Sequence, residues 1–259
     1  MAPITFVVED LDEVDSTNTT LANQAALGAP AGSVVLAAHQ LAGRGRLDRR
    51  WEAPRGTELL CSVLLRPILP PDALQLATVA VAVAARQALQ ERTGRAPELK
   101  WPNDLLYDGR KVGGILAEAH LDAPGGAAGS GAVVVGLSLN CSFEGPEGVS
   151  ATSIEAATGV ALAPRVLLDA ILDVLQPWAE ALDTEAGRAA LLEHYTAVLS
   201  TLGQQVRVEL TNQQFEGLAT SVGPNGELVV EAGGVARSIL SGDVVHLRPL
   251  GTEVPPTAS

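Results

Sequence analysis

The chain has 259 residues, of which 47% are hydrophobic and 18% charged, and it carries a formal net charge of -13 at pH 7. This length holds one large domain or a medium domain with a small appendage, and this apolar content excludes a disordered chain. The acid excess argues against duplex DNA or an anionic membrane as the main partner, because such binding usually requires an extended basic face.

The predicted elements follow in chain order. They are a strand over 4–8, a helix from Ser16 to about Leu27, buried strands over 33–39 and 57–66, a long helix over 72–92, a hairpin around 108–109, a buried strand over 133–141, and helices over 164–182 and 184–200. Asp108-Gly109 lies between two apolar runs, which predicts a type I′ turn. Residues 122–131 are expected to form a flexible loop from their Gly and Ala content.

The pattern changes after Gly203. Five short strand-like runs follow, separated by turns rich in Gly, Pro and Asn; they span 205–210, 215–222, 228–232, 236–240 and 243–249. Short strands at this spacing suggest a small barrel. We therefore predict domains over 1–201 and 202–250, with a flexible tail over 251–259.

The two cysteines and the N-terminus bear on the compartment. Neither Cys61 nor Cys141 lies in a CxxC motif, so the sequence offers no disulfide framework and no zinc motif, and both are expected to be small buried apolar residues. The N-terminal residues lack a signal-peptide pattern, and no segment reaches 18 uninterrupted apolar residues. We expect a cytoplasmic protein.

Residues 43–51, GRGRLDRRW, place four arginines and two glycines in one short segment. Glycines let the backbone approach a ligand closely, and guanidinium groups bind carboxylate or phosphate in a bidentate way. On its own the segment is more typical of a solvated loop than of a ligand site, and a Walker A loop is excluded because no GK[ST] follows.

Three further motifs accompany it: DSTN at 15–18, KWPND at 100–104 and RKVGGIL at 110–116. With GRGRxxRxW, and from about Asp15 to Pro249, the chain resembles the biotin protein ligases. That resemblance implies an α+β fold, with a mixed-sheet catalytic domain similar to class II aminoacyl-tRNA synthetases and a C-terminal SH3-like barrel. It also implies that ATP and biotin are converted to biotinyl-5′-AMP and pyrophosphate, after which a lysine of a biotin carboxyl carrier protein accepts the biotinyl group.

The resemblance gives the cations their roles. Arg44 and Arg46, with Gly45 between them, would hold the carboxylate and the α-phosphate, Arg49 would assist with phosphates, and Trp51 would close over the adenylate. Lys111 would bind the biotin carboxyl and the transferring phosphoryl oxygen, so Arg44 and Lys111 are the expected catalytic residues. Without its motif, Lys111 would be an ordinary exposed hairpin lysine.

The resemblance also implies which residues form the biotin pocket. Ser16, Thr17, Asn18 and Gln40 would hydrogen-bond the ureido ring, although residues 16–18 also suit a plain helix cap. Gly114 and Leu116 would line the pocket, and Ser138 stands where the family usually has glycine. Asp48 likewise replaces a common glycine within the arginine segment.

Asn103 and Asn140 would lie near the nucleotide. Because Pro102 favours an extended Trp101, we expect Asn103 and Asp104 to leave a strand end for a loop that faces the cleft. Asp104 is the carboxylate of the motif set that suits Mg²⁺ beside phosphates, and an Asx-turn role is equally compatible with its spacing.

Two other functions are compatible with parts of the pattern. A lipoyl or octanoyl transferase would lack the pairing of GRGRxxRxW with KWPND, and a non-catalytic sensor could lose Lys111 or the arginines. About fifteen residues precede DSTN, so we expect ligase activity without the DNA binding of relatives that carry a winged helix-turn-helix. The resemblance leaves a homodimer open.

Overall fold

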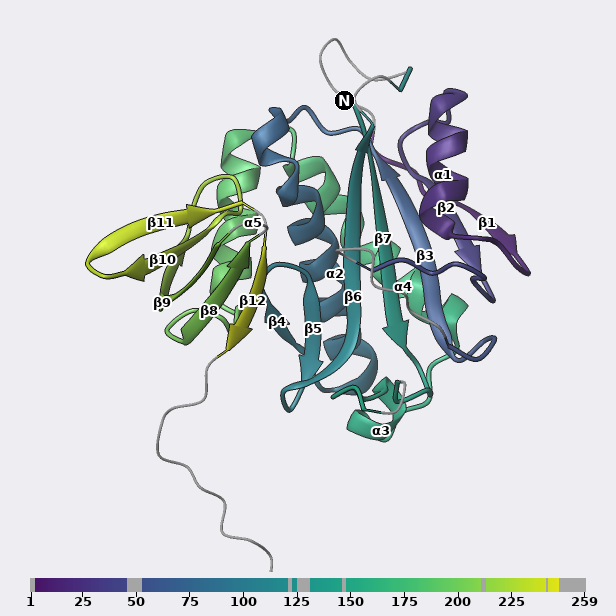
Figure 1. Cartoon of the computed structure of the whole chain (residues 1–259). Helices are drawn as coiled ribbons and strands as arrows, with labels where there is room; N and C mark the ends of the chain where they lie inside the picture. The colour runs from purple at the N-terminus through teal and green to yellow at the C-terminus, as the bar shows by residue number, and fades with distance from the viewer. Residues whose placement is uncertain are drawn as a thin grey trace, which may run out of the picture.

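The computed structural model describes residues 3–45, 53–120, 123–124, 131–145, 148–210, 213–240 and 242–246. A seven-stranded sheet, in the order β1-β2-β3-β7-β6-β5-β4, forms its centre (Figure 1). The strands are β1 Val7–Leu11, β2 Ser33–Ala37, β3 Glu58–Leu65, β4 Glu98–Lys100, β5 Asp104–Tyr107, β6 Arg110–His120 and β7 Ala132–Asn140. Only β1 and β2 pair in parallel among the described strands of this sheet, so the predicted mixed sheet is confirmed.

Helices cover both faces of this sheet. They are α1 Thr17–Ala26, α2 Gln75–Thr93, α3 Ile154–Thr158, α4 Pro164–Ala181 and α5 Glu185–Thr196, with a 3-10 turn over Pro71–Ala73. The side chains of β3 alternate between the faces, as a pleated strand requires. Leu64 packs with Leu21 of α1, whereas Val63 and Leu65 belong to the larger core that contains α2 and α4. None of the helices within the described ranges is long and apolar enough to cross a membrane.

The predicted hairpin is present. Asp108 and Gly109 have φ values of 51° and 72°, and positive φ at both central residues is what a type I′ turn demands. Gly94 ends α2 with a φ of 74°, also as predicted. This turn places Lys111 at the second position of β6, next to β5.

Some predicted boundaries were wrong. The first strand begins at Val7 rather than residue 4, because its pairing with β2 starts at Val7 and Ser33, while Ile4 packs against the core and donates its N–H to Glu180. Asp104 was expected in a loop but is the first residue of β5. The short elements β4 and α3 were not predicted. Most of the expected loop over 122–131 lies outside the described residues.

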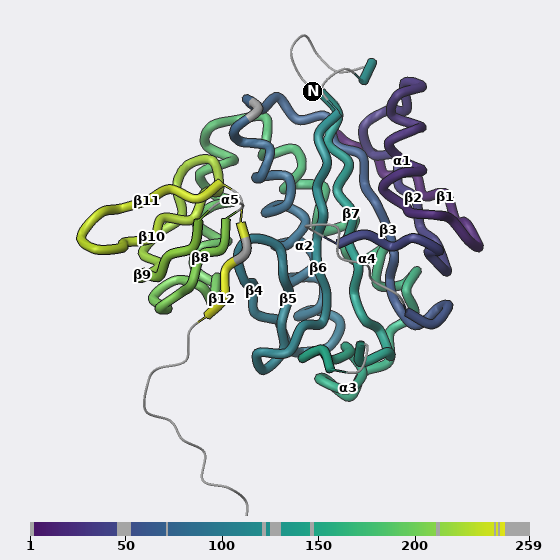
Figure 2. The backbone as a smooth tube through the Cα atoms, in the orientation of Figure 1, coloured from purple at the N-terminus to yellow at the C-terminus, as the bar shows by residue number. Residues whose placement is uncertain are grey.

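Five strands form a second, antiparallel sheet in the order β11-β10-β9-β8-β12. They are β8 Gln205–Leu210, β9 Gln213–Val222, β10 Leu228–Ala232, β11 Val235–Ile239 and β12 Asp243–His246, and each corresponds to one of the five predicted runs. The chain trace places this sheet beside β4, at the opposite end of the large sheet from β1 (Figure 2).

Trp101 joins the two sheets. It is 1% exposed, its backbone N–H donates to Thr201 Oγ1 over 3.0 Å, and its indole Nε1 donates to the Gly226 carbonyl over 3.0 Å. His246 of β12 lies 3.1 Å from the same Thr201 hydroxyl, and burial together with the nearby Lys100 charge lowers the pKa of its imidazole. Trp101, within the KWPND segment, is therefore held by its backbone and by its indole ring.

Candidate functional site

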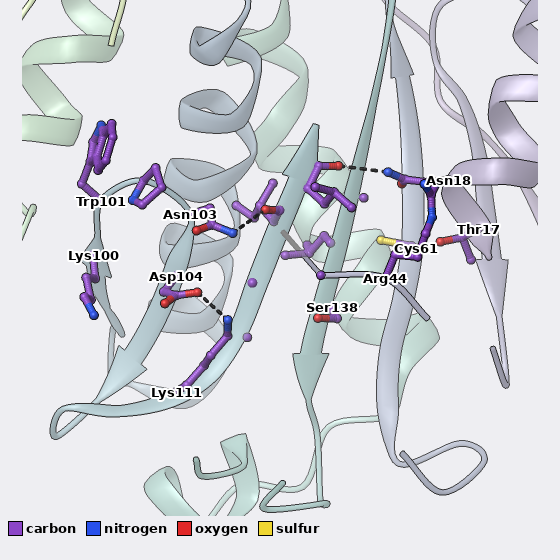
Figure 3. Close-up of a pocket in the computed structure, with 18 of the residues that line it drawn as sticks. Thr17, Asn18, Arg44, Cys61, Lys100, Trp101, Asn103, Asp104, Lys111 and Ser138 are labelled. Atoms are coloured by element: carbon purple, nitrogen blue, oxygen red, sulfur yellow. Dashed lines mark hydrogen bonds and ion pairs between the residues drawn. The ribbon is translucent and has the colours of Figure 1, made fainter. Parts of the chain in front are cut away.

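A cavity of about 660 Å³ lies over the large sheet, between the start of α1, strands β6 and β7, and the KWPND segment (Figure 3). The predicted site residues that line it are Ser16, Thr17, Asn18, Gln40, Arg44, Gly45, Asn103, Asp104, Lys111, Gly114, Leu116 and Ser138. These residues are separated by up to 122 positions in sequence, so the fold brings the separate sequence motifs together at one cavity.

The remaining predicted site residues have other positions. Arg46, Arg49 and Trp51, with Asp48, lie outside the described residues. Asn140 is fully buried, its side-chain Nδ2 donates to the Thr152 carbonyl over 2.8 Å, and it does not line the cavity.

The start of α1 forms one end of the cavity. Ser16 occupies the N-cap position with an extended backbone, yet its hydroxyl makes no capping hydrogen bond with any described residue. Thr17 instead fixes Gln40: its backbone N–H donates to Gln40 Oε1 over 2.8 Å, and its hydroxyl donates to the same oxygen over 3.1 Å. The Gln40 amide NH₂ group is thereby oriented by a partner that holds its oxygen.

Ser62 of β3 extends this network below the cavity. Its hydroxyl is fully buried and lies 2.8 Å from Thr17 Oγ1 and 2.6 Å from Asn18 Oδ1. A hydroxyl carries one proton and an amide oxygen can only accept, so Ser62 donates to Asn18. Asn18 Nδ2 then donates to the Leu116 carbonyl over 3.1 Å and to Glu118 Oε2 over 2.6 Å.

Gly136 makes room for this amide. A Cβ atom at Gly136 would lie 2.3 Å from Asn18 Oδ1, a distance that real Cβ contacts do not show. Any side chain there would displace Asn18 from Ser62 and Glu118. The glycine in β7 is therefore required by the close approach of α1.

Arg44 lies at the rim of the same end. Its Nη2 donates to Glu118 Oε2 over 3.1 Å, and the two side chains are 46% and 28% exposed. A second contact, from Nη2 to Thr19 Oγ1, is long at 3.4 Å. The guanidinium group is thus held mainly by Glu118, which also contacts Asn18.

Lys111 and Asp104 form the other end of the cavity. Lys111 Nζ lies 2.5 Å from Asp104 Oδ1, and the side chains are 33% and 25% exposed (Figure 3). The backbone of Lys111 is bound on both sides. Its register partner in β5 is Leu106, its N–H donates to the Ser150 carbonyl over 3.0 Å, and its carbonyl accepts from Thr152 N–H over 2.8 Å. The ammonium group is therefore carried by a rigid part of the sheet.

Sequence reasoning missed several contributors. Glu118 follows Leu116 by two positions on β6, so strand alternation puts both on one face, and that signal was available. Ser62 is the single polar residue in the apolar run LLCSVLL. Glu209, Val244 and Val245 of the second sheet also line the cavity, and no local pattern indicates that a distant strand reaches this site.

The described residues contain no group of three or more His, Cys, Asp and Glu side chains that could hold a metal ion. Asp104 offers one carboxylate at the cavity. Mg²⁺ commonly uses only one or two protein carboxylates and completes its coordination with water and substrate phosphates. The donor set is therefore compatible with a magnesium ion that arrives with a phosphate ligand.

Comparison with known proteins agrees with this geometry. The profile of the Biotin/lipoate A/B protein ligase family matches residues 11–138, and that of the Biotin protein ligase C terminal domain matches residues 201–247. The biotin–[acetyl-CoA-carboxylase] ligase of Mycobacterium tuberculosis is 35% identical over 250 residues, which cover 91% of this chain and 87% of that protein. The chain belongs to the biotin protein ligase family.

Solved structures of biotin protein ligases share the fold. The enzyme from Aquifex aeolicus in complex with biotin and ATP aligns with a TM-score of 0.78 at 27% identity, covering 93% of this chain and 98% of that one. The ligase from Leishmania major in complex with biotinyl-5-AMP aligns with a TM-score of 0.64 at 25% identity, covering 93% and 98%. The mixed α and β architecture and the C-terminal sheet are thus those of a biotin protein ligase.

Proposed function

We propose that this protein activates biotin with ATP and transfers the biotinyl group to a lysine of a biotin carboxyl carrier protein. In the first step a biotin carboxylate oxygen attacks the α-phosphorus, the bond to the leaving pyrophosphate breaks, and biotinyl-5′-AMP forms. In the second step the lysine amine attacks the acyl carbon and AMP leaves. The observation that carries the proposal is a single cavity that combines neutral hydrogen-bonding side chains at the start of α1 with cationic side chains, Arg44 and Lys111 among them.

The neutral end suits the ureido ring. That ring has two N–H donors and one carbonyl acceptor, and Ser16, Thr17, Asn18 and Gln40 supply hydroxyl and amide groups. Thr17 already orients Gln40, and Ser62 orients Asn18. Fixed partners lower the entropy lost on binding. Gly114, Leu116 and Ser138 would line the pocket for the rest of biotin.

The charges of Arg44 and Lys111 suit the reaction step. Carboxylate and triphosphate repel each other, so fixed positive charge is needed to bring them together and to stabilise the charge that develops at phosphorus. Lys111 and Arg44 would supply it, with Gly45, Arg46 and Arg49 completing the phosphate contacts and Trp51 covering the adenylate. Asn103 lines the cavity and Asn140 ends β7, whose residues 136–138 line it, so we assign both to the nucleotide side.

Mg²⁺ is part of the proposal through Asp104. When bound, the ion would neutralise phosphate charge. Asp104 would give up its contact with Lys111 and hold the metal, which frees the ammonium group for the biotin carboxylate. Replacing Asp104 with Asn should raise the Mg²⁺ concentration needed for half-maximal activity several-fold, whereas the exposed Asp108→Asn should leave it unchanged.

Finer structural assignments belong to the same proposal. We assign residues 1–201 to a catalytic domain similar to class II aminoacyl-tRNA synthetases and residues 202–250 to an SH3-like barrel followed by a tail, supported by the two sheets and their separate family matches.

The net charge of -13 favours a protein that does not bind DNA, and two free, buried thiols suit the reducing cytoplasm. A homodimer stays a prediction, which light scattering tests.

The deciding experiment is biotin-dependent exchange between ATP and labelled pyrophosphate. We expect exchange with biotin and none with lipoate, which lacks the ureido ring. No exchange above that of an Arg44→Ala/Lys111→Ala double variant would refute the ligase proposal, and exchange with lipoate alone would favour the lipoyl class. Specific binding in a gel shift at physiological salt would refute the absence of DNA binding.

A further inference from the structure

Glu118 has an unusual position for a carboxylate. Its Oε2 atom accepts from two cavity-lining side chains at once, Asn18 Nδ2 at 2.6 Å and Arg44 Nη2 at 3.1 Å. Asn18 lies at the hydrogen-bonded end of the cavity, and Arg44 begins the arginine segment. Glu118 is therefore the described side chain that connects these two parts of the site.

The negative charge of Glu118 disfavours the binding of anions next to Arg44, so a compensating benefit is expected. The proposed reaction gathers a carboxylate and a triphosphate, and a carboxylate that touches Arg44 offsets part of the positive charge offered to them. Two donors satisfy Glu118, which reduces the cost of its partial burial. Its benefit must then come from what it does to Arg44.

The contacts indicate which partner is fixed. Glu118 is carried by the long strand β6, and Asn18 is bound in addition by Ser62 and the Leu116 carbonyl. Arg44, in contrast, is 46% exposed, and of its contacts with described residues only the one to Glu118 is short. The strand thus fixes Glu118, and Glu118 fixes Arg44.

The same contact leaves most of the guanidinium group available. An arginine has five N–H donors in a planar fork, and the contacts with described residues engage Nη2 alone. Binding one corner of the fork to a rigid strand sets the plane of the group, and its other donors contact none of the described residues. Glu118 thus offsets part of the positive charge of Arg44 but fixes the orientation of its guanidinium group.

We propose that Glu118 is a positioning residue for the ligase reaction: it orients Arg44 relative to Asn18, so that the ureido end and the carboxylate end of biotin are recognised as one unit. This inference rests on the proposed function. It assigns Glu118 no contact with the reacting atoms and no part in proton transfer.

The test compares Glu118→Ala, Glu118→Gln, Arg44→Ala and the double variant Glu118→Ala/Arg44→Ala. Pyrophosphate exchange gives kcat and KM for biotin, calorimetry gives the biotin affinity, and thermal unfolding reports stability. We expect Glu118→Ala to raise KM for biotin about tenfold, in line with the loss of a charge-assisted contact, and Glu118→Gln to have a smaller effect, because its amide oxygen can still accept from Arg44, without the charge. In the Arg44→Ala background, removal of Glu118 should change KM less than twofold.

Glu144→Ala is the matched control. Glu144 pairs with Arg110 over 3.8 Å, and neither residue lines the cavity. Three results would overturn the inference: a KM change below twofold for Glu118→Ala, an equal effect with and without Arg44, or a fall in KM, which would mean that Glu118 competes with the biotin carboxylate. If the wild-type protein shows no exchange, the proposed function fails separately, and the calorimetric affinities still decide whether Glu118 acts through Arg44.

Discussion

The two ends of the cavity are built on different physical principles. At the α1 end, beneath the Arg44–Glu118 ion pair of the rim, the neutral side chains of Thr17, Asn18 and Ser62 are no more than 5% exposed and hydrogen-bond one another. At the hairpin end, Lys111 and Asp104 form an ion pair whose members are 33% and 25% exposed. A neutral network is stable only when every partner is in place, whereas an ion pair at a partly hydrated site can exchange its partner for a ligand. The α1 end is therefore suited to selecting a ligand and the hairpin end to changing during the reaction.

Lys111→Ala tests the exchangeable end and should have the largest effect. Loss of the ammonium group removes fixed positive charge from the point where charge develops, so we expect kcat for pyrophosphate exchange to fall about 10²–10³-fold. The melting temperature should change little, because a partly exposed ion pair contributes about 0–1 kcal/mol to the free energy of unfolding. Steady-state exchange kinetics and thermal unfolding measure the two quantities.

Arg110→Ala is the matched control for this prediction. Arg110 is the neighbour of Lys111 in the same hairpin, carries the same charge and pairs weakly with Glu144. It should retain activity within twofold of the wild type. Equal losses in both variants would show that the hairpin needs positive charge in general and not at the Lys111 position.

Ser62→Ala tests the fixed end, with an intermediate effect. The substitution leaves Asn18 Oδ1 without the Ser62 donor, in a fully buried position, and we expect it to cost about 1–3 kcal/mol in the free energy of unfolding. Asn18 then keeps only its contacts with Leu116 and Glu118 and is less firmly oriented, so the dissociation constant of biotin should rise about tenfold while kcat changes less. Ser33→Ala, which removes an exposed local hydrogen bond to the Pro30 carbonyl, should change neither. An unchanged biotin affinity for Ser62→Ala would show that Asn18 is held without this network.

This contrast also explains what could be predicted from sequence. Short motifs identified Lys111, Asp104 and residues 16–18, and hydrophobic periodicity with turn residues gave almost every strand and helix. Ser62 and Glu118 were missed because their importance comes from contacts with α1, more than 40 and about 100 positions away. Asp104 was placed in a loop because Pro102 lies just before it, although the predicted hairpin turn at 108–109 extends to the pairing of Asp104 with Gly114.

Ser138→Gly tests the wall between the two ends and should have a small effect. Ser138 lies on β7 opposite Gly114, lines the cavity, and forms no side-chain hydrogen bond with the described residues. We expect its influence on a ligand to be steric, so that glycine lowers the dissociation constant of biotin by up to about threefold, in line with a difference of well under 1.4 kcal/mol. The strand should lose about 0.5–1 kcal/mol of stability, because glycine has more backbone freedom to lose. Calorimetry decides the matter, and weaker binding would show that the hydroxyl contacts biotin.

The two cysteines should have the smallest effect on activity. Burial raises the pKa of Cys61 to about 12 and that of Cys141 to about 11, from an ordinary value of 9.0. Thiolate is the reactive form, so an alkylating reagent at pH 8 should leave the folded protein unlabelled and fully active, and should label both residues in guanidinium chloride. Labelling of the native protein at a rate near that of the denatured chain would contradict this.

The same pKa values predict how stability depends on pH. Between about pH 9 and 11 the unfolded chain loses thiol protons that the folded chain keeps. The unfolded state therefore binds fewer protons, and the free energy of unfolding falls as pH rises, by about 1.4 kcal/mol per thiol per pH unit at most. Guanidinium chloride unfolding at pH 8 and pH 10 measures the slope, and a Cys61→Ala/Cys141→Ala variant should show a shallower one. An identical slope in that variant would assign the alkaline loss of stability to other groups, with the buried Tyr195, whose pKa is also raised, as the next to test.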